Sequence, residues 1–176
     1  MLYVQKDVEK KMLEMLKGAM EALNLGNPWQ ISTDVGPVID DEAQASIGHY
    51  CTKMGLQGRL IAKLEAPKNG RFVAPHVFRV KGIEEMEREV FGPVLHVATF
   101  DADEIDAVIA AINRKGYGLT FGLHTRIEGA SSISSTASMP ATSMSTATRS
   151  APLSARSRSA ARGFPAPARR PAARII

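Results

Sequence analysis

The sequence is short of several features that would assign it to a class of protein. Its 176 residues include one cysteine, Cys51, so no internal disulfide can form. No apolar run approaches the ~20 residues that a membrane-spanning helix needs. The N-terminus, MLYVQKDVEKK, lacks the apolar centre of a signal peptide. These absences predict a cytoplasmic protein that is neither exported nor anchored in a membrane.

Acidic residues are also missing from one end of the chain. Residues 1–129 contain 15 Lys and Arg against 18 Asp and Glu, whereas residues 130–176 contain seven Arg, no Lys and no acid. Ala, Ser, Arg, Pro and Thr fill 39 of those last 47 positions, and no apolar period runs through them. Such a composition buries too little apolar surface to offset its ordering entropy. We therefore expect a folded part over 1–129 and a disordered tail over 130–176.

Residues 1–129 alternate between helix-like and strand-like patterns. Asp101 and Glu104 are spaced as a capping box, and Gly55 and Gly116 stand where two of the helices should stop. Helices are expected over about 8–23, 41–54, 83–89 and 105–115, and strands over 59–65, 71–80, 93–100 and 118–125. This alternation predicts an α/β fold with a largely parallel sheet and flanking helices.

The side chains that could carry chemistry mostly favour structural roles. Cys51 lies in a helix-like stretch with no base arranged beside it, which is typical of a buried structural thiol. The four histidines, at positions 49, 76, 96 and 124, share no metal-ligand spacing, so no metal site is expected. The acidic run EEMERE, 84–89, is typical of a solvated helix face.

The stretch EVFGPV, 89–94, contains more than a turn requires. Gly92 and Pro93 suffice for the turn, yet Glu89 and Phe91 stand directly before it. A carboxylate can accept hydrogen bonds from both hydroxyls of a ribose diol, and an aromatic ring can pack on a flat heterocycle. Glu89 and Phe91 are therefore candidate cofactor-binding residues, although a short coincidence of residue types is the simpler explanation of the motif alone.

The motif resembles the Glu-[Ile/Val]-Phe-Gly-Pro-Val motif of the aldehyde dehydrogenase superfamily. Further blocks agree with that family in order and spacing, and together they cover residues 1–129. The blocks are LGNP (25–28), STDVGPVID (32–40), GRFVAPHVF (70–78), EVFGPVLHV (89–97) and INRKGYGLTFGLHTR (112–126). Their wording is similar to one branch, the 1-pyrroline-5-carboxylate (L-glutamate γ-semialdehyde) dehydrogenase portion of bifunctional bacterial proline-utilisation proteins.

The resemblance implies a cofactor, a substrate class and two roles. In this family the motif glutamate holds the nicotinamide-ribose hydroxyls of NAD and the motif phenylalanine packs beside the nicotinamide. By position these roles fall to Glu89 and Phe91, with Gly92 and Pro93 shaping the turn. The implied parent enzyme is a homo-oligomer that oxidises an aldehyde substrate with NAD.

The sequence also departs from the family. The family's nucleophilic cysteine, its dinucleotide-binding domain and its general base all precede the segment that matches Met1–Met20. Cys51 matches a helix position instead and does not inherit the nucleophile's role. No residue of this chain is therefore expected to be catalytic, and the chain is expected to be an inactive fragment of the catalytic domain.

The composition of residues 130–176 has a separate explanation. Ser, Pro, Thr and Ala fill 32 of these positions, and they are the residues encoded when a GC-rich third codon base moves to the middle position. Regrouping plausible codons lets 138–150 encode a Gly-Asn-x-Tyr-Val-Asn-Arg segment and 159–174 a glycine-rich loop, both in family order. We expect a frameshifted tail. The alternative is a non-enzymatic basic protein whose arginines bind nucleic acid, but only Phe164 could stack on a base.

Overall fold

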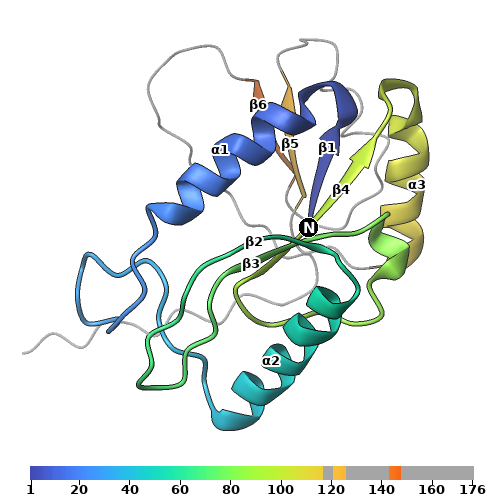
Figure 1. Ribbon diagram of the computed structural model, residues 1–176. Coiled ribbons are helices and arrows are strands. Elements are labelled where there is room, and N and C mark those ends of the chain that lie inside the picture. Colours follow the sequence, from blue (N-terminus) through green and yellow to red (C-terminus); the bar gives the residue numbers. More distant parts are fainter. Residues whose placement is uncertain (117–120, 126–142, 148–176) are drawn as a thin grey trace, which may run out of the picture. The chain divides into compact units, whose positions relative to one another are not determined.

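The structure is a computed structural model that describes residues 1–116, 121–125 and 143–147 (Figure 1). It forms two compact units, Met1–Lys115 and Gly116–Ile176. The predicted domain boundary at residue 129, and the arginines on which the nucleic-acid alternative depends, lie outside the described residues. None of the described helices is long and apolar enough to cross a membrane.

A four-stranded sheet forms the centre of the first unit. Its strands are β1 (Leu2–Gln5), β2 (Leu60–Lys63), β3 (His76–Arg79) and β4 (Val94–Phe100), in the order β1-β4-β3-β2. β4 pairs in parallel with both β1 and β3, and only β2 runs antiparallel to its neighbour. The predicted α/β fold with a largely parallel sheet is confirmed.

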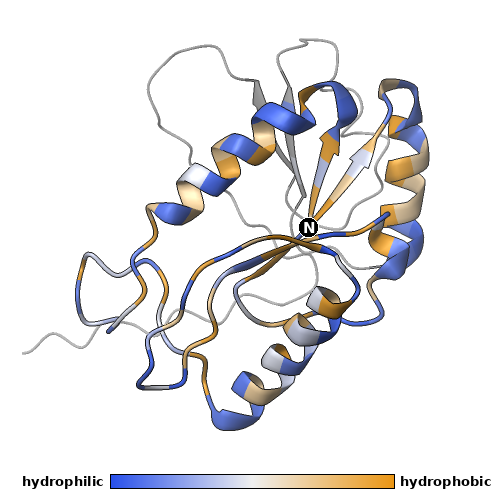
Figure 2. Cartoon of the chain, viewed as in Figure 1, coloured by the Kyte–Doolittle hydropathy of each residue, from blue (hydrophilic) through white to orange (hydrophobic). Residues whose placement is uncertain are grey.

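Alternate residues along the strands define the two faces of this sheet, as the period of two requires. On one face Val77 and Val97 pack with Met20, near the end of helix α1 (Glu9–Glu21). On the other face Phe78 and Ala98 pack with residues of helix α2 (Asp41–Leu56). Figure 2 shows apolar residues concentrated on the strands, between the two helices. Each face of the sheet is therefore covered by one helix.

The ends of α2 follow from a few side chains. At its start the Asp40 carboxylate accepts a hydrogen bond from the Ala43 N–H at 2.7 Å, which caps the helix. At its end the prediction was wrong, because Gly55 lies inside the last turn. Gly58 stops the helix instead, with a φ of +69°, and the Arg59 N–H bonds to the Met54 carbonyl at 3.2 Å.

The predicted helix near residue 105 is confirmed together with both of its end signals. A 3₁₀ turn (η3, Ala102–Glu104) leads into α3 (Ile105–Lys115). The Asp101 N–H donates to the Glu104 carboxylate at 3.1 Å, as part of a capping box. Gly116 follows α3 with a φ of +74°, a conformation that favours glycine.

The helix predicted over 83–89 shrinks to one 3₁₀ turn, η2 (Ile83–Glu85). The reason is a competing set of hydrogen bonds. The Glu85 carboxylate accepts from the Lys81 N–H at 3.0 Å and from Arg59, while Met86 turns to an extended backbone. The chain then continues extended toward β4, so Glu89 and Phe91 are not helical.

The described part of the second unit is a pair of strands. β5 (Phe121–Thr125) confirms the strand predicted near 118–125, and it pairs in parallel with β6 (Ser143–Ala147). β6 lies within the stretch 130–176 for which disorder is expected, and that expectation stays a prediction. Hydrogen bonds between the backbones of β5 and β6 do not depend on the side chains. The amino-acid composition therefore does not predict this strand pairing.

Candidate functional site

The two candidate cofactor residues lie on an extended segment, residues 88–93, that joins η2 to β4. Side chains alternate along it: Val90 packs against the core on the α2 side of the sheet, while Glu89 is exposed and the Phe91 side chain is 81% exposed. Glu89 and Phe91 line the same groove, about 190 Å³ in volume. Its other wall is the surface of α2. The structure thus brings the two predicted residues to one groove, which Arg88 and Val90 also line.

Backbone hydrogen bonds hold the exit of this segment. The Gly92 N–H donates to the Val90 carbonyl at 3.0 Å, and the Val94 N–H donates to the Gly92 carbonyl at 2.7 Å. The Pro93 carbonyl accepts from the His76 N–H of β3 at 2.9 Å. The turn that follows Phe91 is therefore tied to the sheet. No ion pair of the described residues involves the Glu89 carboxylate.

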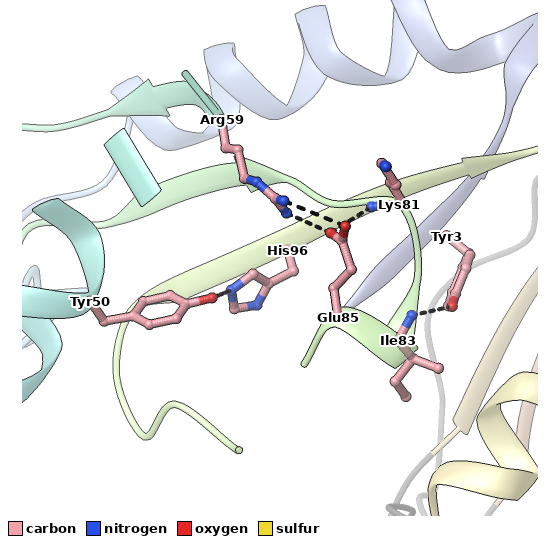
Figure 3. A network of polar contacts seen from close by, with 7 residues as sticks. All are labelled: Tyr3, Tyr50, Arg59, Lys81, Ile83, Glu85 and His96. Atoms are coloured by element: carbon pink, nitrogen blue, oxygen red, sulfur yellow. Dashed lines mark hydrogen bonds and ion pairs between the residues drawn. The ribbon is translucent and has the colours of Figure 1, made fainter. Parts of the chain in front are cut away.

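A polar network lies beside the segment (Figure 3). Arg59 pairs with Glu85, and both side chains are about a quarter to a third exposed. Burial alone would raise the pKa of the Glu85 carboxyl, but the hydrogen bonds from Arg59 and the Lys81 N–H outweigh it and lower the pKa. The sequence prediction of a solvated acidic face missed this role of Glu85. Glu84 also pairs with a distant arginine, Arg114, but its side chain is more exposed than that of Glu85.

A second contact in Figure 3 connects α2 to the sheet. The Tyr50 hydroxyl and His96 Nε2 lie 2.8 Å apart, and His96 is buried on β4. Burial lowers the pKa of His96, with a smaller contribution from the positive N-terminus. The Tyr50 ring also meets Phe78 edge-on, with centroids 6.3 Å apart. His96 is therefore a hydrogen-bonded core histidine, as its place in a strand predicted.

A larger hollow of about 590 Å³ lies between the C-terminal half of α2 and residues 85–88. Its wall combines charged and apolar side chains. Lys53, Arg59 and Arg88 face Glu85 and Glu87, while Met54 and Val80 supply apolar surface. Because the charges of both signs are mixed, the hollow does not select a ligand of one charge.

The remaining sequence candidates have structural roles. Cys51 is buried in α2, and burial raises the pKa of its thiol to about 11. His76 Nδ1 lies 2.7 Å from the Ala74 carbonyl, while His49 and His124 are exposed. No cluster of three or more metal-ligating side chains occurs among the residues that the structure describes.

Comparison with known proteins decides the family. The model of the aldehyde dehydrogenase family matches residues 1–151. The chain belongs to this family. The match continues past residue 129 and includes β6. Enzymes of the family act on aldehydes and generally use NAD or NADP.

The relatives place the chain within the family. The bifunctional protein PutA of Salmonella typhimurium is 40% identical over 135 residues, which are 72% of this chain and 10% of PutA. A betaine aldehyde dehydrogenase of Rhizobium johnstonii is 34% identical over 131 residues, 70% of this chain and 26% of the relative. The crystal structure of a Bradyrhizobium japonicum proline utilization A (PutA) mutant is 39% identical, with a TM-score of 0.76, over 82% of this chain and 15% of that one. The chain thus spans about a tenth of the length of its curated PutA relative.

Proposed function

We propose that Glu89 and Phe91 form the nicotinamide-ribose end of an NAD site. The parent enzyme would oxidise L-glutamate γ-semialdehyde, the open form of 1-pyrroline-5-carboxylate, to glutamate in proline catabolism. The observation that carries this proposal is the arrangement of the 88–93 segment, which presents an exposed carboxylate and an exposed ring to one groove. The identity with PutA proteins supports the substrate and the pathway. A cytoplasmic location and a homo-oligomeric parent stay predictions.

The residues present fit this half of a dinucleotide. Glu89 has no ion-pair partner in the described residues, so its two oxygens are available to accept from the adjacent hydroxyls of a ribose. Phe91 offers an exposed aromatic face on which a planar ring can pack. Ala43 and Ile47 of α2 add apolar surface to the groove.

The chemistry divides between the cofactor and the protein. Bound NAD supplies the hydride acceptor in this family's reaction. Glu89 would hold the ribose by two charge-assisted hydrogen bonds, which fixes the distance of the nicotinamide from the protein. Phe91 would limit the tilt of the ring. Both residues thus bind and orient, and neither moves a proton.

We further propose that this chain by itself does not oxidise aldehydes. The reaction needs a cysteine thiolate as nucleophile. The only thiol is Cys51, which is buried and has a pKa of about 11. At pH 7 roughly one such thiol in 10⁴ is ionised. Burial keeps that small fraction away from an aldehyde in solution.

The test is a titration of the purified chain with nicotinamide mononucleotide, followed by amide chemical shifts. We expect millimolar binding with shifts at residues 88–92. Glu89→Gln should weaken it about tenfold or more, as the loss of a charged hydrogen bond predicts. Glu87→Gln removes a neighbouring exposed carboxylate and should have no effect. The binding of nicotinamide without ribose should weaken in Phe91→Leu but not in Glu89→Gln.

Two outcomes would overturn the proposal. If neither Glu89→Gln nor Phe91→Leu alters the chemical-shift changes that the nucleotide causes, the nucleotide binds elsewhere. NADH formation from the semialdehyde, measured with NAD in the same preparation and lost in Glu89→Gln, would keep the cofactor site but refute the claim of inactivity.

A further inference from the structure

Helix α2 contacts the 88–93 segment at three positions. Arg88 Nη2 donates to the Ser46 hydroxyl at 3.2 Å, and Val90 packs against the core that includes Ile47. Gly92 then lies directly against the Ile47 side chain. Arg88 and Val90 also line the groove that Glu89 and Phe91 line.

The contact at Gly92 is the tightest of the three. A Cβ added there would lie 2.6 Å from Ile47 Cδ1, a distance that real Cβ atoms essentially never show. Its next neighbours would be Ile47 Cγ1 at 3.4 Å and Cγ2 at 3.5 Å, which are near ordinary contact. The Ile47 Cδ1 methyl group therefore leaves no room for a side chain at position 92 unless it moves. The Ile47 side chain is itself held in the core at 5% exposure.

Helix α2 is in turn held to the sheet one turn further on. The Tyr50 hydroxyl bonds to buried His96 of β4, and Cys51 and Met54 pack in the same core cluster as Ile47. The surface that the turn rests on is therefore rigid. Ser46, Ile47 and Tyr50 also line the groove shared with Glu89 and Phe91.

We propose that Ile47 is a positioning residue for the cofactor site: its contact with Gly92 fixes the turn that follows Glu89 and Phe91 and so holds both residues along the groove. This inference rests on the proposed NAD site for its functional meaning. The geometric part, the coupling of Ile47 to the turn, is independent of any ligand. Ser46 assists through Arg88 at the other end of the segment.

A double-mutant cycle in the full chain tests this coupling. Gly92→Ala places a methyl against Ile47 Cδ1, and Ile47→Val removes Cδ1. Gly92→Ala alone should displace the turn and raise amide exchange at Gly92 or Val94 by about tenfold or more, since these two amides hold the turn. The double variant Ile47→Val with Gly92→Ala should return exchange close to the original rate. Gly48→Ala adds the same methyl on α2, with nothing within 4 Å, and should leave the turn unchanged.

The functional readout is the binding of nicotinamide mononucleotide. Gly92→Ala should weaken this binding about fivefold or more, and adding Ile47→Val should restore it. A general loss of stability caused by Gly92→Ala would not be rescued by the second substitution. If Gly92→Ala does not fold, Ser46→Ala provides a milder break, with Ser46→Thr keeping the hydroxyl. Additive effects on exchange in the cycle would overturn the inference. The cycle could also show coupling between Ile47 and Gly92 in amide exchange while the nucleotide does not bind even the unaltered chain. That result would refute the proposed NAD site and leave the coupling intact.

Discussion

The sheet core and the 88–93 segment use phenylalanine in opposite ways. Phe78 is completely buried between β3 and α2, whereas Phe91, only a few residues along the chain, is 81% exposed. The same contrast holds for polar groups: His96 is buried with Tyr50 as its partner, while Glu89 is exposed and forms no ion pair with the described residues. Among the described residues no buried side-chain nitrogen or oxygen lacks a hydrogen-bond partner.

This difference separates residues that stabilise the fold from the two residues that we propose bind a cofactor. Core side chains gain free energy by burial, so their loss lowers stability. An exposed aromatic residue gains little free energy from the fold, so its loss should change stability little. The contrast predicts that substitutions in the two regions change different measurements.

Phe78→Ala should have the largest effect on stability. It removes a ring with no exposed surface and leaves a cavity between α2 and the sheet, which typically costs about 3–5 kcal/mol. Urea unfolding followed by circular dichroism would measure the loss. Phe78→Leu, a smaller change, should cost less and keeps the comparison measurable if the alanine variant is unfolded. A loss below about 1 kcal/mol for Phe78→Ala would mean that this core is loosely packed.

Breaking the Tyr50–His96 pair should have the next largest effect. Tyr50→Phe leaves a buried ring nitrogen without a partner, at a cost of about 1–3 kcal/mol. The pair also predicts a pH dependence, because burial lowers the pKa of His96 in the folded chain. As pH falls below about 6.5, the unfolded chain takes up a proton that the folded chain resists, so stability declines until the folded pKa is passed.

Melting temperatures between about pH 8 and pH 5.5 would measure this slope above the range where carboxylates titrate. His96→Gln should flatten it. His49→Gln, at an exposed position on the same helix as Tyr50, is the matched control and should preserve it. An unchanged slope in His96→Gln would show that another group controls the acid response.

Much of the fold could be predicted because its signals are local. The capping box of Asp101 and Glu104 and the stop at Gly116 depend on neighbouring residues only, and both are confirmed. The errors arise where a distant residue decides. The Glu85 carboxylate accepts a hydrogen bond from Arg59, in a stretch where a longer helix was predicted. Ser143–Ala147 pair with β5. The helix stops at Gly58, which has a positive φ, and not at Gly55. The residue type is the same at both positions, so the sequence does not show which of them adopts this conformation.

The candidate site could be predicted in its residue types but not in its support. Glu89 and Phe91 stand out because a turn does not need them. Ile47 gives no such signal, since an apolar residue in a helix is ordinary. Its proposed role depends on the contact with Gly92, where an added Cβ would lie 2.6 Å from Ile47 Cδ1, and that contact joins residues far apart in the chain.

Substitutions on the exposed side of the segment should have the smallest effect on stability. Phe91→Ala and Glu89→Gln remove side chains that contribute little to the core, so each should stay within about 0.5 kcal/mol of the unaltered chain in urea unfolding. Phe91→Ala is the same chemical change as Phe78→Ala, which makes the pair a direct measure of burial. A loss of about 2 kcal/mol or more for Phe91→Ala would show that the ring packs within the folded chain. Phe91 would then belong to the core, and the reason for assigning it to a cofactor would disappear.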